Sequence, residues 1–113
     1  MKKLFYIFCV IAIAVACKKD QVPPITCTDN VSYSADILPL INLNCSTSGC
    51  HSATDVAGGY DFTTYASISS NVNKILSSID GSGPISMPQG QPSLADSIVA
   101  KVACWSANGA LEN

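Results

Sequence analysis

The chain has 113 residues, and its six basic and eight acidic residues give a formal net charge of −2 at pH 7. This length allows one small domain. The slight negative charge argues against electrostatic binding to nucleic acid or to anionic membrane surfaces. The sequence contains no paired carboxylates, serine triad or phosphate-binding loop. We therefore expect a protein that is not an enzyme.

Residues 1–16 have the pattern of a secretory signal peptide. They begin with "MKK", continue with an apolar run and end with small residues before Cys17. The run is too short for a transmembrane helix, and an uncleaved signal anchor is the alternative. The ending "AVAC" resembles a bacterial lipobox, in which the cysteine is lipidated and begins the mature chain. This resemblance implies that Cys17 anchors an exported lipoprotein of the cell envelope, either periplasmic or at the outer membrane.

Residues 18–30 predict a flexible tether. The segment "KKDQVPPITCTDN" is polar, contains two prolines and lacks an apolar period. We therefore divide the chain into a signal peptide (1–16), a lipid anchor and tether (17–30) and a domain (31–113). Loss of the signal peptide would leave four lysines against eight acidic residues, a net charge of −4.

The first predicted helix of the domain covers residues 34–45. Ser34 is the expected N-cap, Asp36 lies in the electropositive first turn, and apolar residues recur at helical spacing. Pro39 comes early enough in this helix to be accommodated with a bend.

Two further helices are predicted. One runs from Thr63 or Thr64 to Ile79, with an apolar stripe at intervals of three and four residues. Its many serines make it a weak helix in isolation, so packing must stabilise it. The other starts with Ser93 as its N-cap and ends at Gly109. The segment "DGSGPISMPQGQP" between them is too rich in glycine and proline for regular structure.

A domain of this size with long loops buries little apolar surface. Such domains usually need a disulfide, a metal ion or a cofactor for stability. The residues that could bind one are concentrated in "CSTSGCH", which contains Cys45, Cys50 and the only histidine of the chain, His51.

This motif allows four kinds of site. A structural zinc ion needs four ligands and would require Cys27 or Cys104 as a distant fourth. A disulfide between Cys45 and Cys50 would close too small a loop to stabilise much, and it would leave His51 without a role. A catalytic cysteine and histidine are rarely adjacent in sequence. Covalent haem attachment uses all three residues, because two thiols add to the porphyrin vinyl groups and the following histidine binds the iron.

The spacing of the motif departs from the usual haem attachment pattern. Four residues separate the cysteines here, whereas two are usual. The position of His51 directly after Cys50, which brings the imidazole under the porphyrin, is unchanged. Residues 46–49 are small and polar, so the extra residues can bulge outward.

Several segments of the domain follow one another in an order typical of one family. They are "YSADILPLINLNC", the motif itself, "GGYDFTTYASI", "MPQGQPSL" and a last helix whose tryptophan precedes "NGALEN". From Tyr33 onward the chain thus resembles the small single-haem c-type cytochrome domains of exported bacterial proteins. The resemblance implies an all-α, class I cytochrome c-like fold, in which three main helices and long loops surround one covalent haem c. Trp105 would pack where the first and last helices cross, and Tyr60, Phe62 and Tyr65 would line the haem or the core.

The resemblance also implies how the haem is held. Cys45 and Cys50 would bind the porphyrin, and His51 would be the first axial ligand of the iron. The family places the second ligand in the loop between the last two helices, where this chain has Met87 followed by Pro88. Without the signal peptide Met87 is the only methionine, and the chain has no second histidine.

Electron transfer is the predicted function. A haem with histidine and methionine ligands has no open site for a substrate. The expected partners are exported redox proteins, met in brief and weak encounters, and the lipid membrane that holds Cys17, but no nucleic acid. Two alternatives are open. One is a haem module that binds or senses a small ligand when the Met87 loop moves away, and the other is a haem-free lipoprotein held by disulfides.

Lipid and haem attachment would leave Cys27 and Cys104 as the other thiols of the mature chain. Oxidation to a disulfide is the default in an exported protein, and packing of the first helix against the last would bring the two residues close. Two free thiols are the alternative, because disulfide connectivity cannot be deduced from sequence alone.

Overall fold

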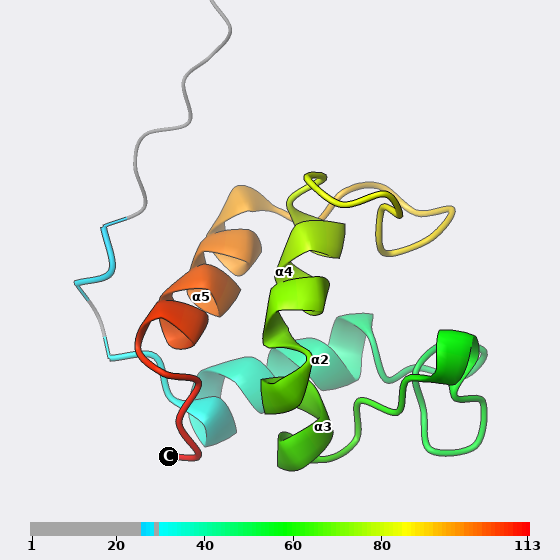
Figure 1. The fold of residues 1–113 in the computed structure, drawn as a ribbon, viewed down its shortest axis with the longest axis horizontal. Helices are drawn as coiled ribbons and strands as arrows, with labels where there is room; N and C mark the ends of the chain where they lie inside the picture. Colours follow the sequence, from blue (N-terminus) through cyan, green and yellow to red (C-terminus); the bar gives the residue numbers. More distant parts are fainter. Residues whose placement is uncertain (1–25, 29) are drawn as a thin grey trace, which may run out of the picture.

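The computed structural model describes residues 26–28 and 30–113. The predicted signal peptide, the Cys17 anchor and most of the tether lie outside the described residues. Within them the chain forms helices and no strand, which confirms the all-α prediction. No helix in this part is long and apolar enough to cross a membrane. In chain order the elements are η2 (Tyr33–Ile37), α2 (Leu38–Asn44), η3 (Ala57–Gly59), α3 (Tyr65–Ser70), α4 (Val72–Ile79) and α5 (Asp96–Ala107), as Figure 1 shows.

The first predicted helix is present, but it begins with a π-helical turn, η2, that continues directly into α2. Pro39 lies in the first turn of α2, where its missing N–H is tolerated. The N-cap is Ser32 and not the expected Ser34, because the Ser32 hydroxyl accepts a hydrogen bond from the Ala35 N–H (3.3 Å). The Ser34 hydroxyl instead donates to the last residue of the chain, Asn113 (2.9 Å).

The second predicted helix is divided into α3 and α4 at Asn71, whose backbone departs from helical geometry (φ −109°, ψ 8°). The helix starts where it was expected to, since Thr64 is the N-cap, and the Thr64 hydroxyl accepts from the Ser67 N–H (3.3 Å). The Asn71 amide donates to the Ser67 carbonyl (2.8 Å), and the Ser70 hydroxyl donates to the Ala66 carbonyl (2.7 Å). These side chains use carbonyl groups that backbone N–H groups would use in a continuous helix, and they favour the break.

The last predicted helix, α5, begins later than expected. Its first residue is Asp96 and its N-cap is Ala95, so the prediction that Ser93 caps it was wrong. No side-chain hydrogen bond caps this end. The Ala95 carbonyl accepts the N–H groups of Ile98 (2.8 Å) and Val99 (3.2 Å), so the helix begins through the backbone alone.

The end of α5 agrees with the prediction. Gly109 adopts a φ of +91°, which glycine tolerates because it has no Cβ. The N–H groups of Gly109 and Ala110 donate to the carbonyls of Ser106 (3.1 Å) and Trp105 (2.8 Å). This pair of bonds is a Schellman motif, and it ends the helix where the sequence places a glycine.

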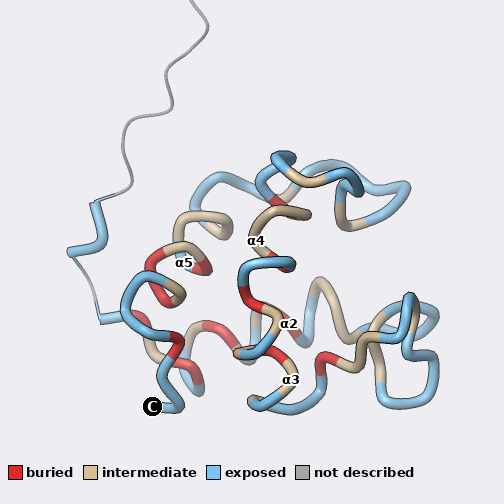
Figure 2. Tube along the Cα trace, in the orientation of Figure 1, coloured by how far each residue is buried: buried red, intermediate tan, exposed pale blue. Residues whose placement is uncertain are grey.

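The core lies where η2 and α4 pack against α5. Tyr33 stacks on Trp105, with ring centroids 5.8 Å apart, and meets the ring of Tyr65 edge-on at 5.0 Å. Trp105 is 1% exposed, and its indole N–H donates to the Leu111 carbonyl (2.9 Å). Trp105, which belongs to α5, therefore packs at the contact between the first and last helices, as expected. Most buried positions lie on the helices, and the loops are mostly exposed (Figure 2). The other core residues are Val31, Ile37, Ile41, Phe62, Ile68, Val72, Ile75, Ile79, Val102, Cys104 and Ala110.

The segment after α5 returns to the start of the first helix. The Asn113 side-chain oxygen accepts from the Tyr33 N–H (2.7 Å), and its backbone oxygen accepts from the Ser34 N–H (2.9 Å). The Tyr65 hydroxyl donates to the Ala110 carbonyl (2.9 Å). The final segment thus joins the first helix, α3 and α5.

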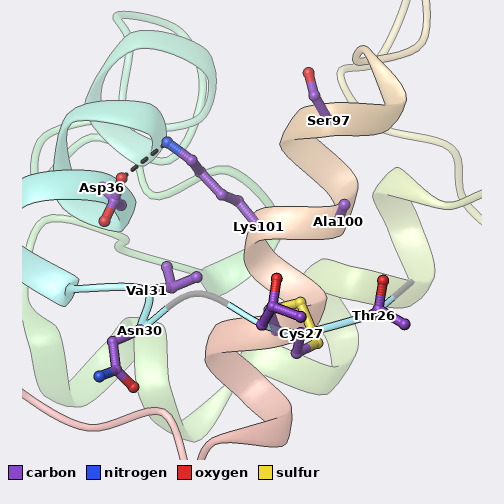
Figure 3. Close-up of a pocket in the computed structure, with 10 residues that line it drawn as sticks. Thr26, Cys27, Asn30, Val31, Asp36, Ser97, Ala100 and Lys101 are labelled. Carbon is purple, nitrogen blue, oxygen red and sulfur yellow. Dashed lines mark hydrogen bonds and ion pairs between the residues drawn. A yellow bond between two sulfur atoms is a disulfide. The ribbon is translucent and has the colours of Figure 1, made fainter.

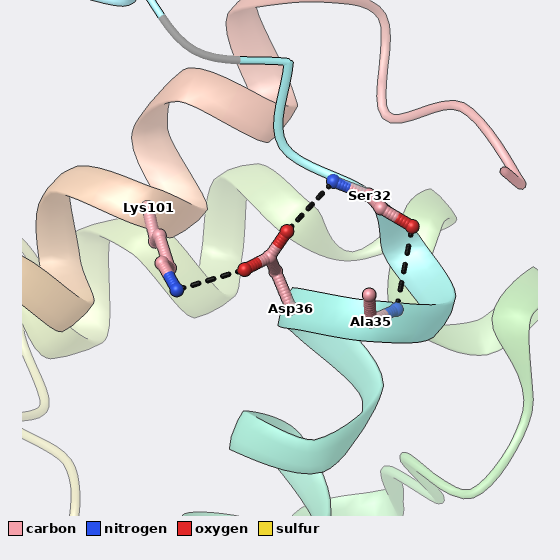
Figure 4. Close-up of polar contacts among 4 residues, drawn as sticks. All are labelled: Ser32, Ala35, Asp36 and Lys101. Atoms are coloured by element: carbon pink, nitrogen blue, oxygen red, sulfur yellow. Dashed lines mark hydrogen bonds and ion pairs between the residues drawn. The ribbon is translucent and has the colours of Figure 1, made fainter.

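The expected disulfide is present: Cys27 and Cys104 are bonded, with Cα atoms 5.2 Å apart. It ties the segment before η2 to α5, and a groove of about 420 Å³ runs beside it (Figure 3). Asp36 and Lys101 line this groove and form an ion pair of 2.8 Å. The second oxygen of Asp36 accepts from the Ser32 N–H (3.0 Å), so one carboxylate joins the start of the first helix to α5 (Figure 4).

Candidate cofactor site

Cys45 is placed by the end of α2. It is the C-cap residue, and its N–H donates to the Ile41 carbonyl (2.8 Å). The thiol is free, is half-buried and packs against the core. Burial, and to a lesser extent the neighbouring Cys50 thiol, raise the pKa of Cys45 to about 11.

The residues between the cysteines form an outward loop. Thr47, Ser48 and Gly49 are exposed, whereas the Ser46 hydroxyl donates to the Phe62 carbonyl (2.7 Å). The Cys50 N–H donates to the Thr47 carbonyl (3.0 Å), which closes a turn. Cys50 follows with an exposed, free thiol. Residues 47–49 therefore project away from the core.

His51 is held by its backbone and by its ring. Its N–H donates to the Cys45 carbonyl (3.0 Å), and its carbonyl accepts from the Phe62 N–H (2.9 Å). The ring atom Nδ1 lies 3.2 Å from the Tyr60 carbonyl oxygen, and the ring centroid lies 4.7 Å from that of Phe62. In the tautomer with a proton on Nδ1, the ring donates to Tyr60 and keeps a lone pair on Nε2 for a metal. Cys45 and His51 are thus joined directly by one hydrogen bond.

Tyr60 and Phe62 form one side of the His51 environment. Their rings stack with centroids 5.7 Å apart, and Phe62 is buried. The Lys74 ammonium donates to the Tyr60 hydroxyl (3.1 Å) and lies 5.2 Å from the centroid of that ring. Tyr65, in contrast, lies in the core against Tyr33. Of the three aromatic residues expected to line the haem or the core, Tyr60 and Phe62 are therefore the two near His51.

Met87 lies on a different segment, the loop between α4 and α5. It is half-buried, packs against the core and donates its N–H to the Ser78 carbonyl (2.9 Å). The Gly83 N–H donates to the Ser77 carbonyl (2.7 Å), so two bonds attach this loop to α4. In Figure 1 the loop after α4 and the loop after α2 extend to the same side of the helices. The structure thus brings Cys45, Cys50 and His51 together in one loop and places Met87 in another.

Asp55 is a residue that the sequence analysis missed. Its carboxylate accepts from the Gly49 N–H (2.9 Å) and from the Ser52 hydroxyl (2.5 Å). The bond from Ser52, followed by that from Gly49, holds the pKa of Asp55 below its usual value. The pattern "S-x-x-D" directly after His51 is a local signal for such a turn.

Acidic, cysteine and histidine side chains do not gather into a cluster of three or more that could hold a metal ion anywhere in residues 26–28 and 30–113. The groove beside the disulfide is lined by none of Cys45, Cys50, His51 and Met87. It is therefore separate from the residues predicted to hold a cofactor.

Comparison of the chain with protein-family models, curated proteins and solved structures finds no match.

Proposed function

We propose that the protein is an electron-transfer protein that carries one covalent haem c on a class I cytochrome c-like domain. The observation that carries this proposal is the loop from Cys45 to His51, in which two free thiols flank a bulge and the histidine is oriented from behind by the Tyr60 carbonyl. No other residues in the described part combine two free thiols with an oriented imidazole.

The donor set fits a c-type haem. Cys45 and Cys50 would hold the porphyrin through thioether bonds, and His51 would bind the iron through Nε2. Met87 would be the second axial ligand, because it is the one thioether among the described residues and lies in an irregular loop. When bound, the haem supplies an iron that is reversibly oxidised and reduced by one electron.

The surrounding residues have separate tasks. The Tyr60 carbonyl accepts a hydrogen bond from the proton on Nδ1 and so fixes the tautomer of His51. This bond makes Nε2 a stronger ligand for the iron. The ring centroid of Phe62 lies 4.7 Å from that of the imidazole, so Phe62 packs against the proposed ligand. Burial of Cys45 at the end of α2 places its thiol on the protein side of the loop, whereas Cys50 is exposed.

The packing of the helices supports the class I fold. The first helix meets the last through Tyr33 and Trp105, and the disulfide and Asn113 reinforce that contact. The loops before α3 and after α4, which carry the proposed ligands, are attached to this helical framework at defined points. Such an arrangement keeps the ligands in place while an electron is exchanged.

The proposed location is the cell envelope, where a lipid on Cys17 anchors the protein and residues 18–30 form a flexible tether. The partners would be exported redox proteins that meet the domain briefly. The net charge of −4 expected for the mature chain favours partners with a basic contact surface.

The decisive experiment is expression of the full chain in a host that matures c-type cytochromes, followed by haem staining of a denaturing gel. We expect haem to stay with the wild-type chain and most of the stain to be lost in Cys50→Ala. Colourless wild-type protein would contradict electron transfer by haem and favour a structural lipoprotein. A five-coordinate iron in the absorption spectrum would instead favour binding of a small ligand.

A further inference from the structure

One carboxylate closes the loop that contains Cys50 and His51. The two groups that donate to Asp55 Oδ2, the Gly49 N–H and the Ser52 hydroxyl, belong to the residues on either side of this pair. The Ser52 hydroxyl also accepts from the Asp55 N–H (3.2 Å). Asp55 therefore holds the chain on both sides of Cys50 and His51, two of the residues that would bind the haem.

We infer that Asp55 is a positioning residue for haem attachment, which sets Cys50 and His51 in a motif that is two residues longer than usual. The inference rests on the proposed function. The two additional residues give the backbone more conformations, and these must be restricted before both thiols can meet one porphyrin. Ser46 restricts the loop at its start, through its bond to the Phe62 carbonyl, and Asp55 restricts it on both sides of Cys50 and His51.

Packing does not restrict the loop in the same way. Thr47, Ser48 and Gly49 are all exposed, and an added Cβ on Gly49 would have no neighbour within 4 Å. Gly49 has a φ of +79°, so the turn before Cys50 has a left-handed conformation that is stabilised by its hydrogen bonds rather than by contacts. Bonds to an ionised carboxylate are stronger than neutral ones, which suits Asp55 to this task.

Asp61 provides a matched control in the same loop. Its carboxylate accepts from the Thr63 N–H (2.9 Å) and from the Thr63 hydroxyl (2.6 Å). Like Asp55, it bonds one amide and one hydroxyl and carries a lowered pKa, chiefly because of the bond from the Thr63 side chain. Its partners lie outside the segment from Cys45 to His51. Asp61→Ala therefore removes a similar turn without breaking the bonds that Gly49 and Ser52 donate to Asp55.

The experiment compares wild type, Asp55→Ala, Asp55→Asn and Asp61→Ala, each matured as the full chain with haem. The denatured, unreduced proteins are alkylated with iodoacetamide, and intact masses are measured with peptide mapping. We expect Asp55→Ala to increase several-fold the fraction of chains in which Cys50 is alkylated and haem is held by Cys45 alone. Asp61→Ala should match wild type. Asp55→Asn should lie between them, because its amide oxygen can still accept both bonds.

A second readout separates positioning from stability. Single attachment leaves one vinyl group, so the pyridine haemochrome band of Asp55→Ala should move to longer wavelength while its far-ultraviolet circular dichroism stays as in wild type. If Asp55→Ala does not accumulate, Ser52→Ala takes its place. This variant removes one of the two bonds to Asp55, and we expect its haemochrome band to move in the same direction by a smaller amount.

Equal attachment in Asp55→Ala and Asp61→Ala would overturn the inference while leaving the proposed function intact. Loss of helical signal in proportion to loss of attachment would also overturn it, since Asp55 would then act on the fold. Absence of covalent haem from the wild-type chain is a distinct result that overturns the proposed function itself.

Discussion

The Nδ1 atom of His51 lies 3.2 Å from the backbone carbonyl oxygen of Tyr60, nine residues later in the same loop. The hydrogen bond that orients the imidazole therefore depends on the course of the backbone, while the Tyr60 ring meets the imidazole edge-on with centroids 6.2 Å apart. The ring of Tyr60 also stacks on Phe62 and lies 5.2 Å from the Lys74 ammonium, which donates to the Tyr60 hydroxyl. Substitution of Tyr60 should thus alter the surroundings of His51 without removing the hydrogen bond that orients it.

Met87→Ala should remove the second axial ligand of the proposed haem. We expect loss of the sulfur-to-iron charge transfer band of the oxidised protein. The reduction potential should fall by a sizeable part of the range of about 0.8 V that axial ligands span. Absorption spectra and redox titration measure both. Ile85→Ala, an exposed change in the same loop, is the control and should leave band and potential unchanged. An unaltered band in Met87→Ala would show that another group binds the iron.

Trp105→Ala should strongly destabilise the domain, because the side chain is 1% exposed and stacks on Tyr33. Large-to-small changes of this kind cost about 3–5 kcal/mol. Trp105→Phe keeps an aromatic ring but leaves the Leu111 carbonyl without its donor, for a smaller loss of about 1–3 kcal/mol. Urea unfolding followed by circular dichroism measures both. Similar losses in the two variants would mean that the indole N–H, and not the stacking, carries the effect.

Reduction of the disulfide between Cys27 and Cys104 should lower the free energy of unfolding by about 2–4 kcal/mol, because the bond closes a loop between residues 77 positions apart. Thiol labelling of the denatured holoprotein should find no reactive cysteine before reduction and two after it. The reduced wild-type protein and Cys27→Ala should lose similar stability, since Cys27 is exposed and contributes little packing. Two reactive thiols before reduction would mean that the bridge does not form.

Asp36 should make the free energy of unfolding depend on pH. The hydrogen bond from the Lys101 side chain, and then that from the Ser32 backbone, hold the pKa of Asp36 below its usual value of 3.8. A carboxyl whose pKa is lower in the folded than in the unfolded state stabilises the fold above the unfolded pKa. This contribution is lost as the pH falls through the folded pKa. We expect Asp36→Asn to lower the urea midpoint slightly at neutral pH, with the difference from wild type vanishing below that folded pKa.

The Lys101→Ala background is the control for this effect, because it retains only the Ser32 bond to Asp36. The Asp36→Asn difference should be smaller there. Both partners are partly exposed, with side chains 50% and 29% accessible for Lys101 and Asp36, so the effect should be modest and weaken in high salt. An effect of Asp36→Asn that persists unchanged at acid pH would show that packing, not ionisation, is responsible.

Cys17→Ser should release the protein from membranes into the soluble fraction. A single acyl chain binds membranes only marginally, so we expect several chains on Cys17. Mass spectrometry of the membrane-extracted protein should show a lipidated Cys17 as the first residue. Persistence of Cys17→Ser in the membrane fraction would instead indicate an uncleaved signal anchor.

The sequence by itself determined where helices form and where some of them start and stop. Apolar spacing of three and four residues predicted the segments of α2, α4 and α5, because a helix buries one face whatever it packs against. The helix start at Thr63 or Thr64 and the helix stop at Gly109 were predictable, because threonine and a left-handed glycine at these places satisfy nearby backbone groups. The closeness of Cys45, Cys50 and His51 could also be predicted, because these residues lie only a few positions apart in the sequence.

Only the tertiary structure decided the features that depend on distant partners. Ser32 caps the first helix while Ser34 bonds to Asn113, 79 positions away, and no local pattern contains that partner. The Tyr60 carbonyl faces His51 because the loop between them folds back on itself, and a backbone acceptor has no signature in the sequence. The capacity of Asp55 to hold both sides of the Cys50 and His51 pair likewise arises from the return of that loop, because a carboxylate binds whichever N–H and hydroxyl groups the folded backbone brings to it.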